Sequence, residues 1–258
     1  MSTSNNDNAV IQTLLNRRSI RQFTSDPIDD DTIAILEEVA QRAPSSQYLN
    51  DWSAIRITDQ ALKNRLAEIV HQPYIAQAPL LYVFILDEHR NIAIARTKGV
   101  TDEQITLNAS YRFTQAQNDA VLALQSMETA ANALGLGCVI LGSILNNVSA
   151  LIELMNLPKY TYPVLGLAIG KPAQSPELKP RMARSMQFFE NTYPANDADV
   201  LEPLHDFDEQ VHQYYDLRNT SRPVDAFSDQ IASAAADQGV LNRPLMPEAI
   251  KQGFALQR

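Results

Sequence analysis

The stretch AQNDAVLALQSMETAANALGLGCVIL, residues 116–141, joins a long apolar helical pattern to a strand pattern. Apolar side chains recur at helical spacing in two stripes. The first stripe is Ala116, Ala120, Ala123, Met127, Ala130 and Leu134, and the second is Val121, Leu122 and Leu124. We predict a helix that is buried nearly all round, and its alanines suit a central packing helix or a subunit seam. The strand CVIL, residues 138–141, follows at once.

Helical and strand patterns alternate on both sides of this stretch. Helical spacing predicts helices over residues 28–43, 61–70 and 146–157, and apolar runs predict strands over 53–59, 80–86 and 164–170. Beyond residue 190 the chain becomes acidic and polar, with short helical patterns at 207–215 and 247–254. No repeat and no Gly/Ser-rich linker divides the chain, so we expect a single domain over residues 1–258, with a C-terminal excursion over about 190–258.

Composition excludes several classes of function. The formal net charge of −9 over 258 residues opposes binding to nucleic acid or to an anionic membrane. Cys138 is the sole cysteine, which excludes an intrachain disulfide and a thiolate zinc cluster. The first residues, MSTSNNDN, lack the features of a secretory signal, and the apolar runs are far shorter than the roughly 20 residues of a spanning helix. We therefore expect a cytoplasmic protein with no nucleic-acid or membrane partner.

Sequence motifs for catalysis by side chains are absent. No G-x-G-x-x-G, P-loop, G-x-S-x-G or H-E-x-x-H pattern occurs. His205 and His212 lie seven positions apart with Asp208 between them, but polar surface histidines are commoner than metal ligands. We expect no metal site and no catalytic acid, base or nucleophile.

Cationic and hydroxyl side chains gather in two segments. Arg17, Arg18, Ser19 and Arg21 follow the first helical pattern, and Lys179 and Arg181 lie in a loop after the last core strand. Arginine forks and a hydroxyl can converge on the oxygens of a phosphate. From the residues alone, surface ion pairs with the aspartates near residues 26–31 are an equal alternative.

Four motifs favour the phosphate site, because their order and spacing resemble those of a known family. They are RRSIRQFTSDPI (17–28), APSSQYLN (43–50) before SAIRITD, GLGCVILGSILNN (135–147) and ELKPR (177–181). From about residue 10 to 230 the chain resembles the FMN-dependent nitroreductase superfamily, and within it the NADPH-preferring branch of nitroreductases and flavin reductases. The resemblance implies an α+β, three-layer α-β-α fold with a central, mostly antiparallel sheet. It also implies an intertwined homodimer with two FMN, in which the C-terminal excursion wraps the partner and carries the NADPH loop.

The same resemblance implies which residues bind FMN. The phosphate and the ring would be held by Arg17, Arg18, Ser19 and Arg21, with Arg21 near the N1 and O2 edge. Further flavin contacts would be Ser45, Ser46 and Gln47, then Gln72 and Tyr74, then Leu141, Gly142 and Ser143, and finally Lys179 and Arg181. The backbone after the strand at 138–141 would address flavin N5, which requires a small residue there.

The chain departs from the branch pattern at three positions: Arg17, where relatives often have His, Ser143, where they have Gly, and Leu145, which is Arg in several of them. For the nicotinamide donor, the segment YYDLRNTSR (214–222) resembles a stretch whose arginines hold the 2'-phosphate of NADPH, so Arg218 and Arg222 inherit that role. Tyr48 is a candidate neighbour of the open flavin face.

The implied activity is ping-pong hydride transfer from NADPH to flavin N5, the reactive centre, and then to nitroaromatics, quinones or similar small-molecule electron acceptors. Two alternatives stay open. The enzyme could be a flavin reductase that supplies reduced FMN, or the chain could be a flavin-binding module without turnover.

Overall fold

The computed structural model describes residues 8–217 and 219–256, and these form two compact units. One unit contains the chain up to Ser175 and again from Arg243 onward, and the other is Pro176–Asn242. The sequence placed a C-terminal excursion at about 190–258. The second unit begins at Pro176, and the chain returns to the first unit at Arg243, so the excursion overlaps the second unit and its bounds stay a prediction.

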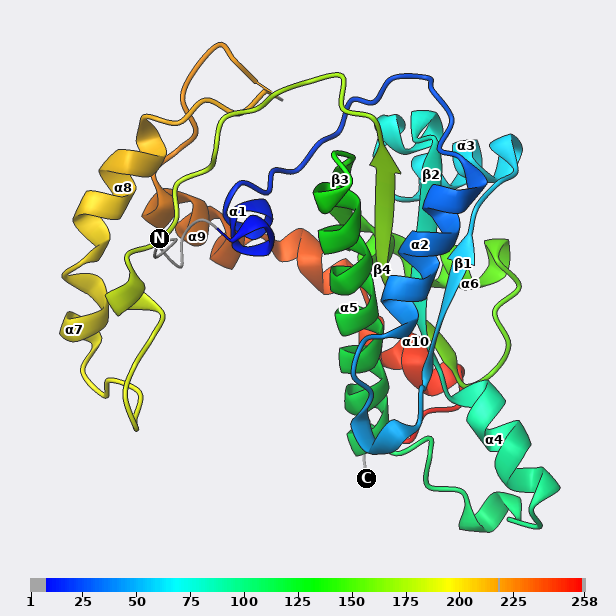
Figure 1. The fold of residues 1–258 in the computed structure, drawn as a ribbon. Coiled ribbons are helices and arrows are strands. Elements are labelled where there is room, and N and C mark those ends of the chain that lie inside the picture. Colours follow the sequence, from blue (N-terminus) through cyan, green and yellow to red (C-terminus); the bar gives the residue numbers. More distant parts are fainter. Residues whose placement is uncertain (1–7, 218, 257–258) are drawn as a thin grey trace. The chain divides into compact units, whose positions relative to one another are not determined.

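The first unit is built on an antiparallel sheet (Figure 1). In the described residues its strands are β1 (Trp52–Arg56), β2 (Leu80–Asp87), β3 (Gly137–Leu141) and β4 (Thr161–Gly170), in the order β1-β2-β4-β3. Every residue of β2 is buried, because the strand lies between β1 and β4 and both of its faces are covered. The three predicted strands and CVIL are confirmed, although β1 ends three residues earlier than expected.

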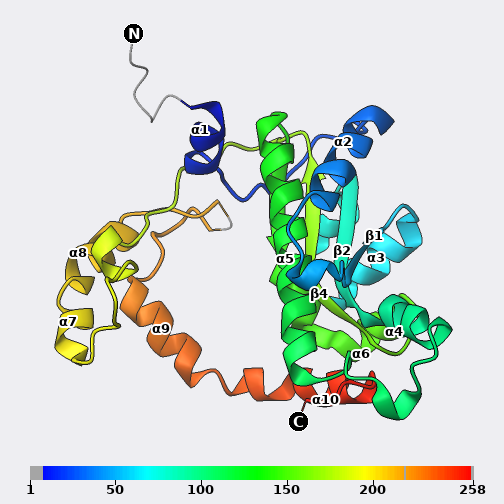
Figure 2. The ribbon, with the colours of Figure 1, turned by 60° about the horizontal axis from the view of Figure 1, so that its bottom comes forward.

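Helices cover both faces of the sheet, as Figure 2 shows. Residues at alternate positions of β2, such as Tyr82 and Phe84, share a core with α2 (Asp30–Gln41) and α5 (Ser110–Ala133). The intervening residues of β2 share a second core with α3 (Gln60–Ile69) and α6 (Val148–Leu154). The predicted three-layer α-β-α architecture is therefore confirmed.

The long helix α5 differs from its prediction in one respect. Its first stripe is largely buried, but Val121 and Leu122 of the second stripe are 36% and 43% exposed. Burial nearly all round is thus wrong for the single chain. Exposed apolar residues on a helix whose opposite face is buried agree with the second option that the sequence left open, a subunit seam.

The end of the chain completes the first unit. Helix α10 (Leu245–Lys251) and Phe254 close the sheet end near the start of α5. The Phe254 and Phe113 rings meet edge to face with centroids 5.0 Å apart, and Ala249 is fully buried. This packing explains why residues after Arg243 belong to the first unit. Helix α1 (Ala9–Leu15), at the other end of the chain, has no buried residue.

The second unit is a small helical cluster. Its helices are α7 (Asp197–Leu201), α8 (Leu204–His212) and α9 (Phe227–Ala236). Phe207 and Phe227 pack with ring centroids 5.2 Å apart, and the Asp208 carboxylate accepts the Ser228 N–H at 2.8 Å. Of the helices in residues 8–217 and 219–256, none has the length and apolar character needed to cross a membrane.

Candidate functional site

Arg17 is held by a buried carboxylate. Its Nε donates to Oε1 of Glu128 at 2.8 Å, and the Glu128 side chain is fully buried while that of Arg17 is 26% exposed. The second Glu128 oxygen accepts from Gln125 at 3.0 Å. Because the ion pair uses Nε, it orients the guanidinium and leaves both terminal nitrogens for another acceptor. This is not the exposed ion pair with residues 26–31 that composition alone allowed.

The segment after Arg17 lies against β3. The Ile20 N–H donates to the Cys138 carbonyl at 2.8 Å, and Ser19 forms a parallel bridge with Cys138. The absence of a side chain at Gly137 permits this approach, since a Cβ there would lie 2.8 Å from Ile20. Arg17, Ser19 and Arg21 alternate with buried Ile20, and the pleat of an extended segment puts alternate side chains on the opposite face.

Arg18 has an unusual environment. Its Nε is buried and has no hydrogen-bond partner in the described part of the chain. A buried donor without an acceptor costs free energy, so such a group is a candidate for binding a ligand that the structure does not contain.

The end of β3 presents open backbone. Leu141 is buried in the sheet opposite Gly166, and Gly142 begins the short 3-10 helix Gly142–Asn147. A Cβ placed on Gly142 would meet nothing within 4 Å, so a planar ring has room to approach. Ser143 is half-buried, and Leu145 packs into the core with α10, so position 145 makes an apolar contact here.

Gln72 and Tyr74 lie at the start of the 3-10 helix Pro73–Gln77, before β2. Both side chains are half-buried, and Tyr74 packs against the core on the α3 face of the sheet. The segment 19–23 reaches the same end of the sheet, because Phe23 forms a bridge with Pro172 directly after β4. The structure therefore places Gln72 and Tyr74 at the same end of the sheet as the segment 19–23, where β2 begins and β4 ends.

Ser45, Ser46 and Gln47 belong to a loop that contacts α5. The Ser46 N–H donates to both oxygens of Asp119, at 3.1 and 3.2 Å. Glu128, which holds Arg17, comes nine residues later on α5, or about 13 Å along the helix axis. Within one chain, the two predicted groups are attached to α5 at separate places.

A cavity of about 620 Å³ opens beside this loop. Tyr48, 85% exposed, stands at its lining together with Asn50, Trp52, Arg90 and Tyr82. The lining mixes aromatic and polar groups, as a site for a planar polar molecule does.

The remaining predicted cations lie in the second unit. Lys179 Nζ pairs with buried Asp216 at 2.9 Å and lies 5.7 Å from the Tyr214 ring centroid. Arg181 is exposed and donates to the carbonyl of Lys179 at 3.0 Å. Arg222 pairs with Asp225 at 2.5 Å, and both side chains are more than half exposed. Arg218 lies outside the described residues.

No group of three or more His, Cys, Asp or Glu side chains in the described ranges could hold a metal ion. His205 faces Glu209 at 3.5 Å, and Nδ1 of His212 lies 2.9 Å from the Val224 carbonyl oxygen.

The sequence reasoning missed the buried carboxylates Asp119 and Glu128. Both lie on α5, and both are at most 2% exposed. An acidic residue beside the alanine stripe of a predicted buried helix indicates a carboxylate that pairs with another group, because unpaired carboxylates are almost never buried. Their partners, Ser46 and Arg17, are far away in the sequence and could not be named from it.

Comparison with known proteins identifies the family. The sequence profile of the nitroreductase family matches residues 14–171, and that of the nitroreductase C-terminal domain matches residues 179–257. The chain belongs to the nitroreductase family. A nitroreductase-family relative from Bacillus subtilis, named FMN reductase (NADPH), is 33% identical over 87% of this chain and 90% of its own length. Another from Salmonella typhimurium, named oxygen-insensitive NADPH nitroreductase, is 36% identical over 95% of this chain and 98% of its own.

A solved structure supports the same assignment of the fold. The structure of NfrA1 from B. megaterium matches with a TM-score of 0.89 and 32% identity, covering 96% of this chain and 99% of that chain. The boundary between the two matching profiles, between residues 171 and 179, falls where the structure separates its two units.

Proposed function

We propose that this nitroreductase-family chain is an NADPH-dependent FMN oxidoreductase that reduces nitroaromatics, quinones or similar acceptors. The observation that carries the proposal is the orientation of Arg17 by buried Glu128, next to Ser19 at the edge of β3. A chain of net charge −9 that fixes a cation beside a hydroxyl in this way has built an anion site. The relatives from B. subtilis and S. typhimurium both have NADPH in their names, and the first is named as an FMN reductase.

The donors of the first unit fit FMN. Arg17 and Ser19 would hold its phosphate, and the unpartnered Nε of Arg18 would gain an acceptor. Gly142 leaves space for the ring to approach the backbone. Lys179 and Arg181 of the second unit are proposed as further phosphate or ribityl ligands, with Lys179 already oriented by Asp216.

A flavin cofactor that supplies the chemistry, with a protein that binds and orients it, explains the absence of a catalytic motif. When bound, FMN would supply the hydride-transfer chemistry between the donor and the acceptor. Arg21 would supply positive charge beside the ring, Gly142 would give the ring access to the backbone, and Gln72 and Tyr74 would orient it. The protons that the reduced acceptor needs can come from water, so no side chain of the proposed site has to supply them.

We propose that a second copy of the chain completes the site. Ser45, Ser46 and Gln47 attach to α5 about 13 Å from Arg17, and the exposed strip of Val121 and Leu122 lies between the two attachment points in the sequence of α5. A homodimer that buries this strip would bring the loop of one subunit to the cations of the other.

Arg222 and Arg218 are proposed as the site for the NADPH 2'-phosphate. The exposed pair of Arg222 with Asp225 is weak in water, so a phosphate can displace the carboxylate and then leave again. A donor that must depart between half-reactions requires such a contact. The cytoplasmic location stays a prediction of the sequence.

The test is a spectrum of the purified protein. We expect a yellow protein that bleaches anaerobically with NADPH and regains its colour with a nitroaromatic. A colourless protein that cannot be reconstituted with FMN would refute the proposal. Tight FMN binding with no NADPH-driven bleaching would indicate a binding module.

A flavin reductase is the second candidate, favoured by the name of the B. subtilis relative. Steady-state rates with free FMN and with a nitroaromatic separate the two. A ratio strongly in favour of free FMN would assign the chain to flavin supply.

A further inference from the structure

The loop that follows α2 is strained. Gln47, Tyr48 and Asn50 have φ values of 52°, 60° and 49°, in the left-handed region that residues with a side chain rarely adopt. Three such residues within four positions persist only where surrounding contacts hold them. The same loop contains the predicted flavin contacts Ser45 to Gln47, so its shape matters for the proposed function.

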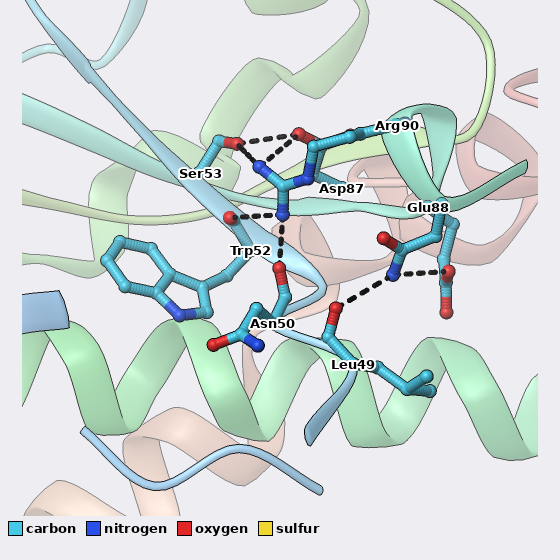
Figure 3. Close-up of polar contacts among 8 residues, drawn as sticks. Leu49, Asn50, Trp52, Ser53, Asp87, Glu88 and Arg90 are labelled. Atoms are coloured by element: carbon cyan, nitrogen blue, oxygen red, sulfur yellow. Dashed lines mark hydrogen bonds and ion pairs between the residues drawn. The ribbon is translucent and has the colours of Figure 1, made fainter. Parts of the chain in front are cut away.

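Helix α4 (Glu88–Thr97) holds one side of this segment, as Figure 3 shows. The guanidinium of Arg90 donates to the carbonyls of Asn50 and Trp52, the latter at 3.2 Å, and to the Ser53 hydroxyl at 3.2 Å. Asp87 orients the guanidinium at 3.6 Å and also accepts from Ser53 at 2.6 Å. The downstream end of the loop is therefore fixed by a cation.

Helix α5 holds the other side, through an anion. Both oxygens of Asp119 accept the N–H of Ser46, and Arg112 donates to the Gln47 side chain at 3.0 Å. Gln115 donates to the Ser46 hydroxyl. Because Asp119 faces the backbone N–H of the loop, its position and its charge decide whether the upstream end stays in place.

Asp119 has a second carboxyl group beside it. Asp51 is 0% exposed and lies close enough to Asp119 for the two carboxyl groups to interact, and neither of its side-chain oxygens has a hydrogen-bond partner in the described ranges. Two carboxyl groups can form a hydrogen bond with each other only if one of them holds a proton. Burial and the neighbouring Asp119 raise the pKa of Asp51 to about 7.

The surrounding charges favour keeping this proton. Arg112 on α5 and Glu88 on α4 lie near the pair, and beyond Glu88 lie Asp87, whose backbone N–H donates to the Asp51 carbonyl, and Arg90, which pairs with Asp87. Glu88 is fully buried, and burial and Asp51 raise its pKa to about 8. With every carboxyl group ionised, the acidic groups would outnumber the two arginines, and the excess charge would be buried.

We propose that Asp51 and Asp119 are positioning residues for the flavin loop, and that one shared proton keeps Asp119 on the Ser46 N–H. When this proton leaves to bulk water, two buried carboxylates face each other, Asp119 turns away from the loop, and FMN binding weakens. The proposal deepens the proposed function and rests on it.

The test is the FMN dissociation constant from pH 6 to 9 for wild type, Asp51→Asn and Asp51→Leu. The Asn amide donates permanently to Asp119 and cannot titrate, while Leu offers no donor. We expect wild-type FMN binding to weaken about tenfold more than that of Asp51→Asn as pH rises through the pKa of Asp51. Asp51→Leu should bind weakly at every pH. Glu38→Gln, an exposed carboxylate that pairs with Arg42, is the control for the loss of one charge.

Identical pH profiles for wild type and Asp51→Asn would overturn the positioning role. Absence of FMN binding in all four proteins at every pH would instead refute the proposed function, so the two failures are distinguishable. Amide hydrogen exchange of the wild type tests the proposal without flavin and does not depend on whether the variants fold. In the wild type, amide exchange of residues 43–50, corrected for its intrinsic pH dependence, should accelerate above pH 7 relative to β2. Constant protection of the loop across this range would also reject the proposal.

Discussion

Arg17 and Arg222 are both paired with a carboxylate, but the two pairs differ in what surrounds them. Glu128 is buried and receives Arg17 at 2.8 Å, whereas Asp225 and Arg222 are both more than half exposed. A buried acceptor fixes the orientation of the guanidinium before any ligand arrives, which lowers the entropic cost of binding. An exposed pair is screened by water and rearranges easily. The difference matches a cofactor that stays bound at Arg17 and a donor that exchanges at Arg222.

Removing the buried partner should have the largest effect. Glu128→Ala leaves Arg17 without its acceptor, so we expect the free energy of unfolding to fall by about 3 kcal/mol and FMN binding to weaken strongly. Chemical denaturation and flavin titration measure both. Asp225→Ala is the matched variant at the exposed pair, and there we expect little change in the free energy of unfolding, because water screens the pair. Equal losses in the two variants would erase the distinction.

Glu88 allows a comparison between a buried carboxyl group with an unpaired oxygen and the buried, paired Glu128. Glu88 is as buried as Glu128, but its Oε1 has no partner in the part of the chain that the structure describes, and its pKa is raised to about 8. A raised folded-state pKa means that wild-type stability falls as pH rises from about 4.5 to about 8, because the unfolded chain loses its proton first. Glu88→Gln does not titrate, so it should gain on the order of 2 kcal/mol relative to wild type across this window.

Thermal unfolding of both proteins at pH 5 and pH 8.5 checks this expectation. Parallel pH dependences would show that Glu88 is ionised in the folded protein at neutral pH.

Gly137 begins β3 and Gly142 follows it directly. Substitution of Gly137 tests how the segment after Arg17 is placed, and substitution of Gly142 tests the approach of the flavin. Gly137→Ala should destabilise by about 1.5 kcal/mol, because its Cβ would meet Ile20 at 2.8 Å and push the segment 19–23 away from the sheet. Gly142→Ala meets nothing within 4 Å and should leave stability nearly unchanged while weakening FMN binding. The reverse order of the two unfolding midpoints would contradict this account of the site.

The smallest expected effect lies at the exposed pair. Arg222→Ala should raise the KM for NADPH about tenfold and change the KM for NADH little, since only NADPH carries the 2'-phosphate. The double variant with Arg218→Ala should widen the gap. Equal changes with both donors would reject the proposed 2'-phosphate site.

Much of the fold could be predicted because its signals are local. The apolar run of β2, the aspartate cap of α2 and the alanine stripe of α5 each lie within one segment, and each element appeared where expected. Helix α4 had no such signal. Its cap, Asp87, is also the last residue of β2, so strand and helix share a boundary without a turn residue.

The proposed site divides in the same way. Arg17, Ser19 and Gly142 were singled out through motifs that are contiguous in the sequence. Asp119 and Glu128 were not, because each acts on a residue more than 70 positions away. Their partners are chosen by which segments the sheet brings beside α5.

The sequence by itself determined individual helices and strands through periodicity. Through short motifs that resemble a known family, it also indicated the layers of the fold, the family and the residue types that suit a flavin. Only the tertiary structure decided which cations are oriented and which loop is strained. Both properties depend on burial and on contacts between distant segments, and a linear pattern contains neither.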